Sequence, residues 1–189
     1  NMPKDNIERA IKKGEGNDPD SNYEEVRYEG YGPEGIAIIV EAMTNNKNRT
    51  AAEIRSIFSK SGGNLGESGS VSFNFKRLGL INLDKKITSE NEIFEFVVEN
   101  GSEDLEINED EYLIYCDHSV LHILNEKIIK KFGQTNSADL VWKNDNTIEV
   151  GKESAEKLFK LLNLLEDNED VQGVSSNFEV SDQILTSLT

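Results

Sequence analysis

The chain has 189 residues, of which 36% are hydrophobic and 30% charged, and its formal net charge at pH 7 is −16. A chain of this length forms one or two small domains, and it contains no run of about 18 apolar residues that would span a membrane as a helix. A single cysteine, Cys116, excludes an intramolecular disulfide, and so low a cysteine content is typical of proteins in a reducing compartment.

The N-terminal segment carries the signals of a short helix. Pro3 stands at a first helical position, Gly14 follows the last one, and Ile7 and Ile11 repeat at helical spacing. So short a helix is marginally stable alone in water, and its apolar stripe needs a partner. We therefore expect that sequence preceding the helix of residues 1–14 has been removed or is not shown here.

Apolar patterns then predict two strands, 23–29 and 36–41, and the second is expected to be central in a sheet because it is almost entirely apolar. A helix is expected next, with Thr50 and Glu53 in the spacing of a capping box. The glycine-rich loop GGNLGESGS follows, and after it a strand at 71–76. These elements form a strand-helix-strand unit.

The next stretch contains a longer set of elements. Strands are predicted at 80–83, 105–107, 112–116 and 140–143, and helices at 89–100 and 119–132. The first helix begins with a second capping box, Ser89 and Glu92, and the two helices end at Gly101 and Gly133. The resulting order, strand-helix-strand-strand-helix-strand, is the ferredoxin-like pattern.

A last strand-helix-strand set is predicted at 147–150, 153–166 and 171–178. Joined to the earlier unit, it gives a second ferredoxin-like order. The sequence therefore predicts an α+β fold of two ferredoxin-like α/β domains, the second inserted in the first. The predicted parts are an outer domain of residues 23–78 with 146–178, an inserted acidic domain of residues 79–145, and a tail, 179–189. A single α+β sheet is the alternative.

The loop GGNLGESGS, residues 62–70, invites comparison with phosphate-binding loops. A Walker loop and a dinucleotide-binding loop both follow a strand and precede a helix, whereas this loop has the reverse order and contains no lysine. Two interpretations stay open. Gly62 and Gly63 end a helix before a turn, or the loop exposes its backbone as a contact surface.

Residues suited to catalysis or metal binding are few. Cys116, His118 and His122 combine metal-ligand types, but a structural zinc site needs four ligands, so we expect no metal. No nucleophile motif of the form Gly-x-Ser-x-Gly occurs, and the runs of carboxylates are typical of solvated turns. The sequence therefore predicts a protein that is not an enzyme and uses no cofactor.

Charge is distributed unevenly along the chain. Residues 1–78 contain 11 Lys/Arg and 12 Asp/Glu, whereas residues 79–189 contain 9 and 24. Nucleic acid is repelled by the second part, so contacts with it are expected from the first. The candidate contact residues lie around one helix, the glycine loop and the next strand: Lys47, Asn48, Arg49, Arg55, Lys60, Gly62, Gly63, Asn64, Gly66, Ser68, Lys76 and Arg77. An ordinary solvated helix face is the alternative.

Four stretches carry a resemblance to a known family: NMPKDNIERAI at 1–11, YEGYGPEG at 28–35, TNNKNRTAAEIR at 44–55 and FSKSGGNLGESGSV at 58–71. They resemble the YebC/PmpR family, which includes the mitochondrial translational activator of cytochrome oxidase. A further similar stretch is EDNEDVQGVSSNF at 166–178. The resemblance implies three domains, an N-terminal helical one and two α/β ones, with the third inserted into the second. It also implies that the helical domain is truncated here and that its basic segment is absent.

The resemblance implies regulation of gene expression without catalysis. Family members are described as ribosome-associated factors that relieve stalled translation, or as DNA-binding transcriptional regulators. Because the acidic second part of the chain opposes wrapping of duplex DNA, we expect the ribosome and its RNA to be the partner, with DNA as the alternative. The contact would be made by the face of residues 44–77 and by the basic segment of the family, which is absent from this sequence. An acidic scaffold for a basic protein is a third hypothesis. No membrane or small-molecule partner is expected, and the implied location is the bacterial cytoplasm, or the mitochondrial matrix in a eukaryote.

Overall fold

A computed structural model describes residues 22–188, which divide between two compact units. The first unit contains the residues up to Asn74 together with those from Asn144, and the second contains Phe75–Lys143. The helix predicted at 1–14 lies outside the described residues. Within residues 22–188, none of the helices has the length and apolar character needed to cross a membrane.

The first unit is built on a four-stranded sheet with the strand order β3-β1-β2-β9. Its strands are β1 (Glu24–Tyr31), β2 (Ala37–Thr44), β3 (Asn64–Leu65) and β9 (Val171–Ser176). The short 3-10 helix η1 (Pro33–Gly35) links β1 to β2. Both β1 and β9 pair antiparallel with β2, which is thus the central strand that its apolar sequence predicted. A separate parallel pair joins β8 (Ile148–Glu149) to β10 (Phe178–Glu179).

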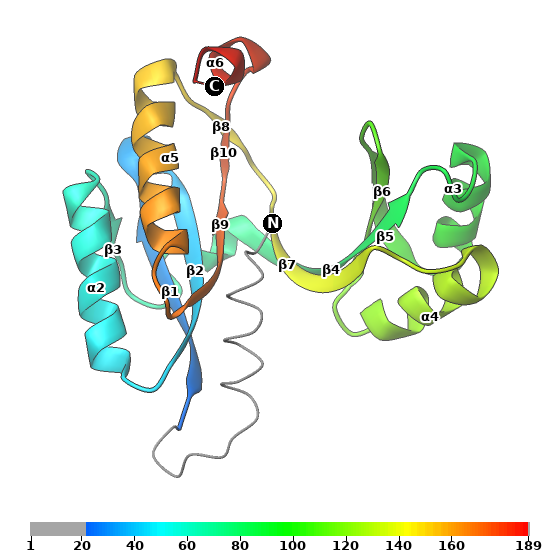
Figure 1. Cartoon of the computed structure of the whole chain (residues 1–189), viewed down its shortest axis with the longest axis horizontal. Helices are drawn as coiled ribbons and strands as arrows, with labels where there is room; N and C mark the ends of the chain where they lie inside the picture. Colours follow the sequence, from blue (N-terminus) through cyan, green and yellow to red (C-terminus); the bar gives the residue numbers. More distant parts are fainter. Residues whose placement is uncertain (1–21, 189) are drawn as a thin grey trace. The chain divides into compact units, whose positions relative to one another are not determined.

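Two helices, α2 (Lys47–Lys60) and α5 (Lys152–Glu166), lie side by side on one face of this sheet (Figure 1). Each has apolar residues at three- and four-residue spacing, and it buries that stripe against the sheet. The core between helices and sheet includes Ile36, Ile38, Val40, Ile54, Phe58, Leu158, Leu161 and Leu165. Complete burial of side chains of this size contributes about 1.5–3 kcal/mol each. A last helix, α6 (Asp182–Leu188), follows β10.

The second unit has the ferredoxin-like order of elements. They are β4 (Phe75–Asp84), α3 (Glu90–Glu99), β5 (Ser102–Ile107), β6 (Glu111–Asp117), α4 (Leu121–Phe132) and β7 (Ser137–Asn144). The sheet order is β5-β6-β4-β7, so the two strands joined by each helix are separated by a strand of the other half. Its core includes Ile81, Leu83, Ile93, Val97, Tyr112, Ile114, Leu124 and Ile128. Gly101 and Gly133, which follow the helices as predicted, have positive φ values of 89° and 109°.

The predicted α+β class with two ferredoxin-like domains is confirmed, but the strands of the first unit differ from the prediction. The prediction of a strand at 71–76 is wrong, because Ser72–Asn74 form the 3-10 helix η2 and β4 begins only at Phe75. The strand that follows α2 is instead β3, inside the glycine loop, where it pairs with β1. The expected strand at 147–150 exists as β8, but it lies outside the four-stranded sheet.

The capping box expected at Thr50 and Glu53 is wrong. The helix begins at Lys47, because the Asn46 side chain caps it by accepting a hydrogen bond from the Arg49 N–H at 3.1 Å. Thr50 is fully buried inside the helix.

The second predicted capping box is wrong in its hydrogen bonds. Ser89 does occupy the N-cap position of α3, but its side chain makes no capping hydrogen bond. The Glu92 carboxylate accepts instead from the Thr88 hydroxyl at 2.9 Å. The start of the helix was therefore predicted correctly, but by a contact that the structure does not contain.

Candidate nucleic-acid interface

Helix α2 carries five of the predicted contact residues on an exposed surface. The helix has four cations and one carboxylate: Lys47, Arg49, Arg55, Lys60 and Glu53. Asn48 is exposed in its first turn. Lys47 forms an ion pair with Glu24 of β1. Arg55 and Lys60 are exposed and have no ion-pair partner within the part of the chain that the structure describes, so their charges are available to an anionic ligand.

Arg49 is engaged inside the protein. Its Nη2 donates a hydrogen bond of 2.8 Å to Oδ2 of Asp170, a carboxylate that is only 4% exposed. The hydroxyl of the buried Thr50 lies 2.7 Å from the same oxygen. The hydrogen bond to Asp170, together with its charge, raises the pKa of Arg49 above its ordinary value. Arg49 thus ties the start of α2 to the turn before β9, and a phosphate would compete with Asp170 for it.

The glycine loop begins as a helix C-cap. Gly62 has a positive φ of 77°, and the Gly63 N–H donates to a carbonyl of the last helical turn at 2.8 Å. The interpretation of this pair as a helix end is therefore confirmed. A Cβ on Gly63 would lie 2.5 Å from the Tyr31 carbonyl oxygen, and one on Gly66 would lie 2.5 Å from the Ser70 hydroxyl oxygen. The space that Gly63 and Gly66 leave by having no Cβ is therefore occupied by other atoms of the protein.

The rest of the loop is fixed by a buried carboxylate on β1. The Glu29 side chain is fully buried, and its Oε2 accepts hydrogen bonds from the backbone N–H groups of Val71 and Ser72, each at 2.9 Å. Its Oε1 accepts from Arg27 Nε at 3.1 Å. Burial by itself raises the pKa of Glu29, but the backbone donors, among them Gly69, and the Arg27 charge outweigh it and hold the pKa below its usual value. Glu29 is therefore ionised at neutral pH.

A second residue of β1 holds the same loop. The Tyr31 hydroxyl donates to the Ser70 carbonyl oxygen at 2.7 Å, and the Glu29 carbonyl accepts from the Gly66 N–H at 2.8 Å. The predicted contact residues Asn64 and Ser68 are exposed on this fixed frame. Glu29 and Tyr31 were missed as site residues. The available signal was the motif YEGYGPEG, which belongs to the resemblance but was given no role.

Lys76 and Arg77 belong to the second unit. Both lie in β4, where Lys76 forms an ion pair with Glu103 of β5 and the Arg77 guanidinium lies 4.8 Å from the centre of the Trp142 ring. The structure therefore groups the other predicted contact residues in the first unit and assigns these two to a different compact body.

The residues with metal-ligand chemistry do not form a cluster. Cys116 is buried in the core of the second unit, whereas His118 and His122 are exposed, each beside a carboxylate. Burial raises the pKa of the Cys116 thiol, which makes it a poor nucleophile. Within residues 22–188, no group of three His, Cys, Asp or Glu side chains is arranged to hold a metal ion.

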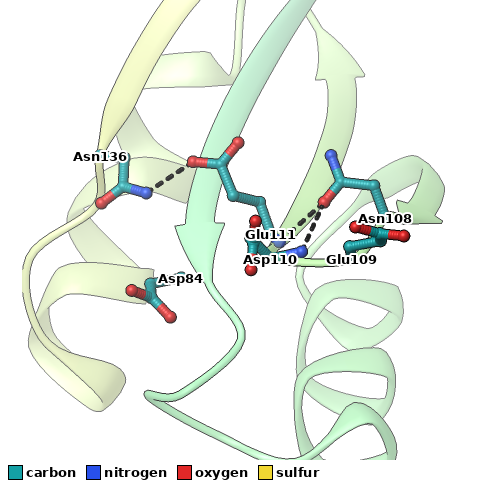
Figure 2. A pocket seen from close by; sticks show the side chains of 6 residues that line it. All are labelled: Asp84, Asn108, Glu109, Asp110, Glu111 and Asn136. Atoms are coloured by element: carbon teal, nitrogen blue, oxygen red, sulfur yellow. Dashed lines mark hydrogen bonds between the residues drawn. The ribbon is translucent and has the colours of Figure 1, made fainter.

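An acidic recess in the second unit shows the opposite polarity to α2. Figure 2 shows the six residues that line it: Asp84, Asn108, Glu109, Asp110, Glu111 and Asn136. The Asn108 side chain accepts from the Glu111 N–H at 2.7 Å, and the Asn136 side chain donates to the Glu111 carboxylate at 2.6 Å. The four carboxylates of this recess repel a phosphate backbone.

The fold and this distribution of charge define a two-domain α+β protein in which one ferredoxin-like unit interrupts the other. The family model described as "TACO1/YebC second and third domain" matches residues 23–178, and the chain belongs to this family. The family is regulatory in type and is not a known enzyme family. A crystal structure of a conserved hypothetical protein, Aq1575 from Aquifex aeolicus, is similar to this chain. The two are 45% identical with a TM-score of 0.83, over 97% of this chain and 76% of the other.

Proposed function

We propose that the protein is a non-enzymatic regulator of gene expression that acts on the ribosome, relieves stalled translation and contacts RNA through α2 and the loop at 62–70. The observation that carries the proposal is the segregation of charge. Helix α2 has four cations and one carboxylate, whereas α3 has four glutamates and no cation. A chain of this kind is attracted to a polyanion through its cationic helix, whereas its acidic unit is repelled. The site of action would be the bacterial cytoplasm, or the mitochondrial matrix in a eukaryote.

The test is co-sedimentation of the full-length protein with ribosomes over a salt series, with duplex DNA as competitor. The informative variant is Arg55→Glu with Lys60→Glu, because neither side chain is needed for the fold. Loss of two phosphate contacts should weaken binding and make the slope of log K against log salt less steep by about 1.5.

The matched control is Lys127→Glu with Lys130→Glu, which makes the same change of charge on exposed residues of α4. Unchanged ribosome binding by the α2 variant, or equal loss in both variants, would contradict the proposed contact surface.

The second candidate function is DNA-binding transcriptional regulation. The same helix supports it, because an exposed cationic α-helix fits the major groove of duplex DNA. Displacement from ribosomes by excess DNA, with sequence-selective DNA binding at physiological salt, would favour this function. Ribosome association that duplex DNA does not displace would favour translation.

The third candidate is an acidic scaffold for a basic protein, and one observation favours it. Phe94 and Val98, which lie one turn apart on α3, are 55% and 57% exposed among glutamates. Residues 75–143 contain 8 Lys/Arg and 14 Asp/Glu. In the same sedimentation experiment, Phe94→Gln with Val98→Gln should abolish association if this face makes the contact, and the α2 variant should then bind normally.

A further inference from the structure

Phe73 stands out on the surface of the first unit. Its side chain is 72% exposed, the largest value among the exposed large hydrophobic residues of the described chain. A single exposed apolar residue is common on protein surfaces and needs no explanation by itself. What distinguishes Phe73 is the backbone that carries it.

That backbone is fixed on both sides of Phe73. Before it, the N–H groups of Val71 and Ser72 are bound by the buried Glu29 carboxylate, and the Val71 side chain is completely buried. After it, the Asn74 N–H donates to the Val71 carbonyl at 3.0 Å, and the Asn74 carbonyl accepts from Asp145 at 3.1 Å. These hydrogen bonds hold the turn that presents the ring to solvent.

The surroundings of the ring indicate what it contacts. The preceding loop, 66–70, contains only glycine, serine and one glutamate, and it is exposed or half-buried. Large exposed apolar side chains are absent from described residues 62–72, so the chain leads to the ring through a polar loop. A lone aromatic face beside hydroxyls and backbone groups suits a nucleobase, which stacks through its flat face and forms hydrogen bonds at its edge.

We propose that Phe73 is a stacking platform for an unpaired nucleobase of RNA. The Glu29-bound turn holds the ring in place, Ser68 and the loop backbone lie next to it in sequence for contacts with the base edge or sugar, and the cations of α2 supply attraction for phosphates. The base must be unpaired, because bases in a duplex already stack on their neighbours. This inference rests on the proposed function, since it identifies the nucleic acid as single-stranded RNA and names the residue that contacts a base.

The test uses the full-length protein and a short single-stranded RNA of mixed sequence, with the same strand annealed to its complement for comparison. Phe73→Ala should weaken binding of the single strand about tenfold, which matches the usual loss of one base stack. Phe73→Trp should restore binding. Ile123→Ala, a control that removes a strongly exposed apolar side chain from helix α4, should leave it unchanged.

A second measurement follows stacking directly. The natural chain has one tryptophan, Trp142. RNA should quench the fluorescence of the Phe73→Trp variant well beyond that of the natural protein, because a stacked base lies against the new indole. Full binding by Phe73→Ala, or quenching no greater than in the natural protein, would overturn the role of Phe73 while the RNA-binding function stood. If the natural protein bound neither RNA nor ribosomes, both proposals would fall together.

Discussion

Replacement of Glu29 tests whether this buried carboxylate holds the glycine loop in place. Glu29→Ala leaves the N–H groups of Val71 and Ser72 without the acceptor that each now has at 2.9 Å. An unsatisfied buried donor costs about 1–3 kcal/mol, so two of them should lower the free energy of unfolding by about 2–5 kcal/mol. Removal of the buried charge offsets part of this loss. Both bonds end on Oε2, so Glu29→Gln can keep them with its single amide oxygen. Because charge-assisted bonds are about twice as strong as neutral ones, the glutamine variant should lose only about 1–2 kcal/mol.

The acid dependence of stability provides a second check on Glu29. Its pKa in the folded protein lies below the ordinary value of 4.5, so the folded state binds the proton less well than the unfolded state. The stabilisation is therefore complete above pH 4.5 and is lost as the pH falls through the folded pKa. The free-energy difference between the natural protein and Glu29→Gln should be largest at neutral pH and shrink in acid.

The measurement is denaturant unfolding of the first unit, followed by hydrogen exchange at Gly69, Val71 and Ser72. Trp142 lies in the second unit, so its fluorescence reports that unit and serves as an internal control for a substitution in the first. A Glu29→Ala protein within about 0.5 kcal/mol of the natural one, or with unchanged exchange in the loop, would refute the proposed role of the carboxylate.

Two further pairs of substitutions test other parts of the same frame. Gly63→Ala should lower the free energy of unfolding by about 1–3 kcal/mol, because its Cβ would lie 2.5 Å from a β1 carbonyl oxygen. The control is Gly173→Ala, whose Cβ would have no atom within 4 Å, and its free energy of unfolding should stay within about 0.5 kcal/mol of the natural value. Equal stability of the two variants would show that the loop relaxes freely. Asp170→Ala should lower the melting temperature more than Arg49→Ala, because Asp170 also binds the buried Thr50; the reverse order would contradict the network.

The second unit shows how far local sequence signals reach. Its helices were placed by their apolar spacing and by Gly101 and Gly133, and these signals act within a few residues. In the first unit, β3 has only two residues between glycines, too few for any alternating pattern. Its pairing with β1 is set by tertiary contacts, so periodicity could not reveal it.

The polar contacts that shape the site were beyond sequence reasoning for the same reason. Glu29 binds backbone groups more than forty positions away, and Arg49 binds a carboxylate 121 positions away. In sequence, both look like ordinary solvated charges. Composition identified a cationic helix and a bare loop, but it could not separate the charges that the fold uses from those that it leaves exposed.

That separation decides how mutational data on the site should be interpreted. Arg49, Gly62, Gly63 and Gly66 each have a role within the fold, so a loss of binding on their substitution would follow from a damaged frame as readily as from a lost contact. Arg55, Lys60 and Phe73 are exposed, and none of them supports the core. Loss of RNA or ribosome binding in variants of these three, at unchanged stability, is therefore the result that would specifically identify them as contact residues.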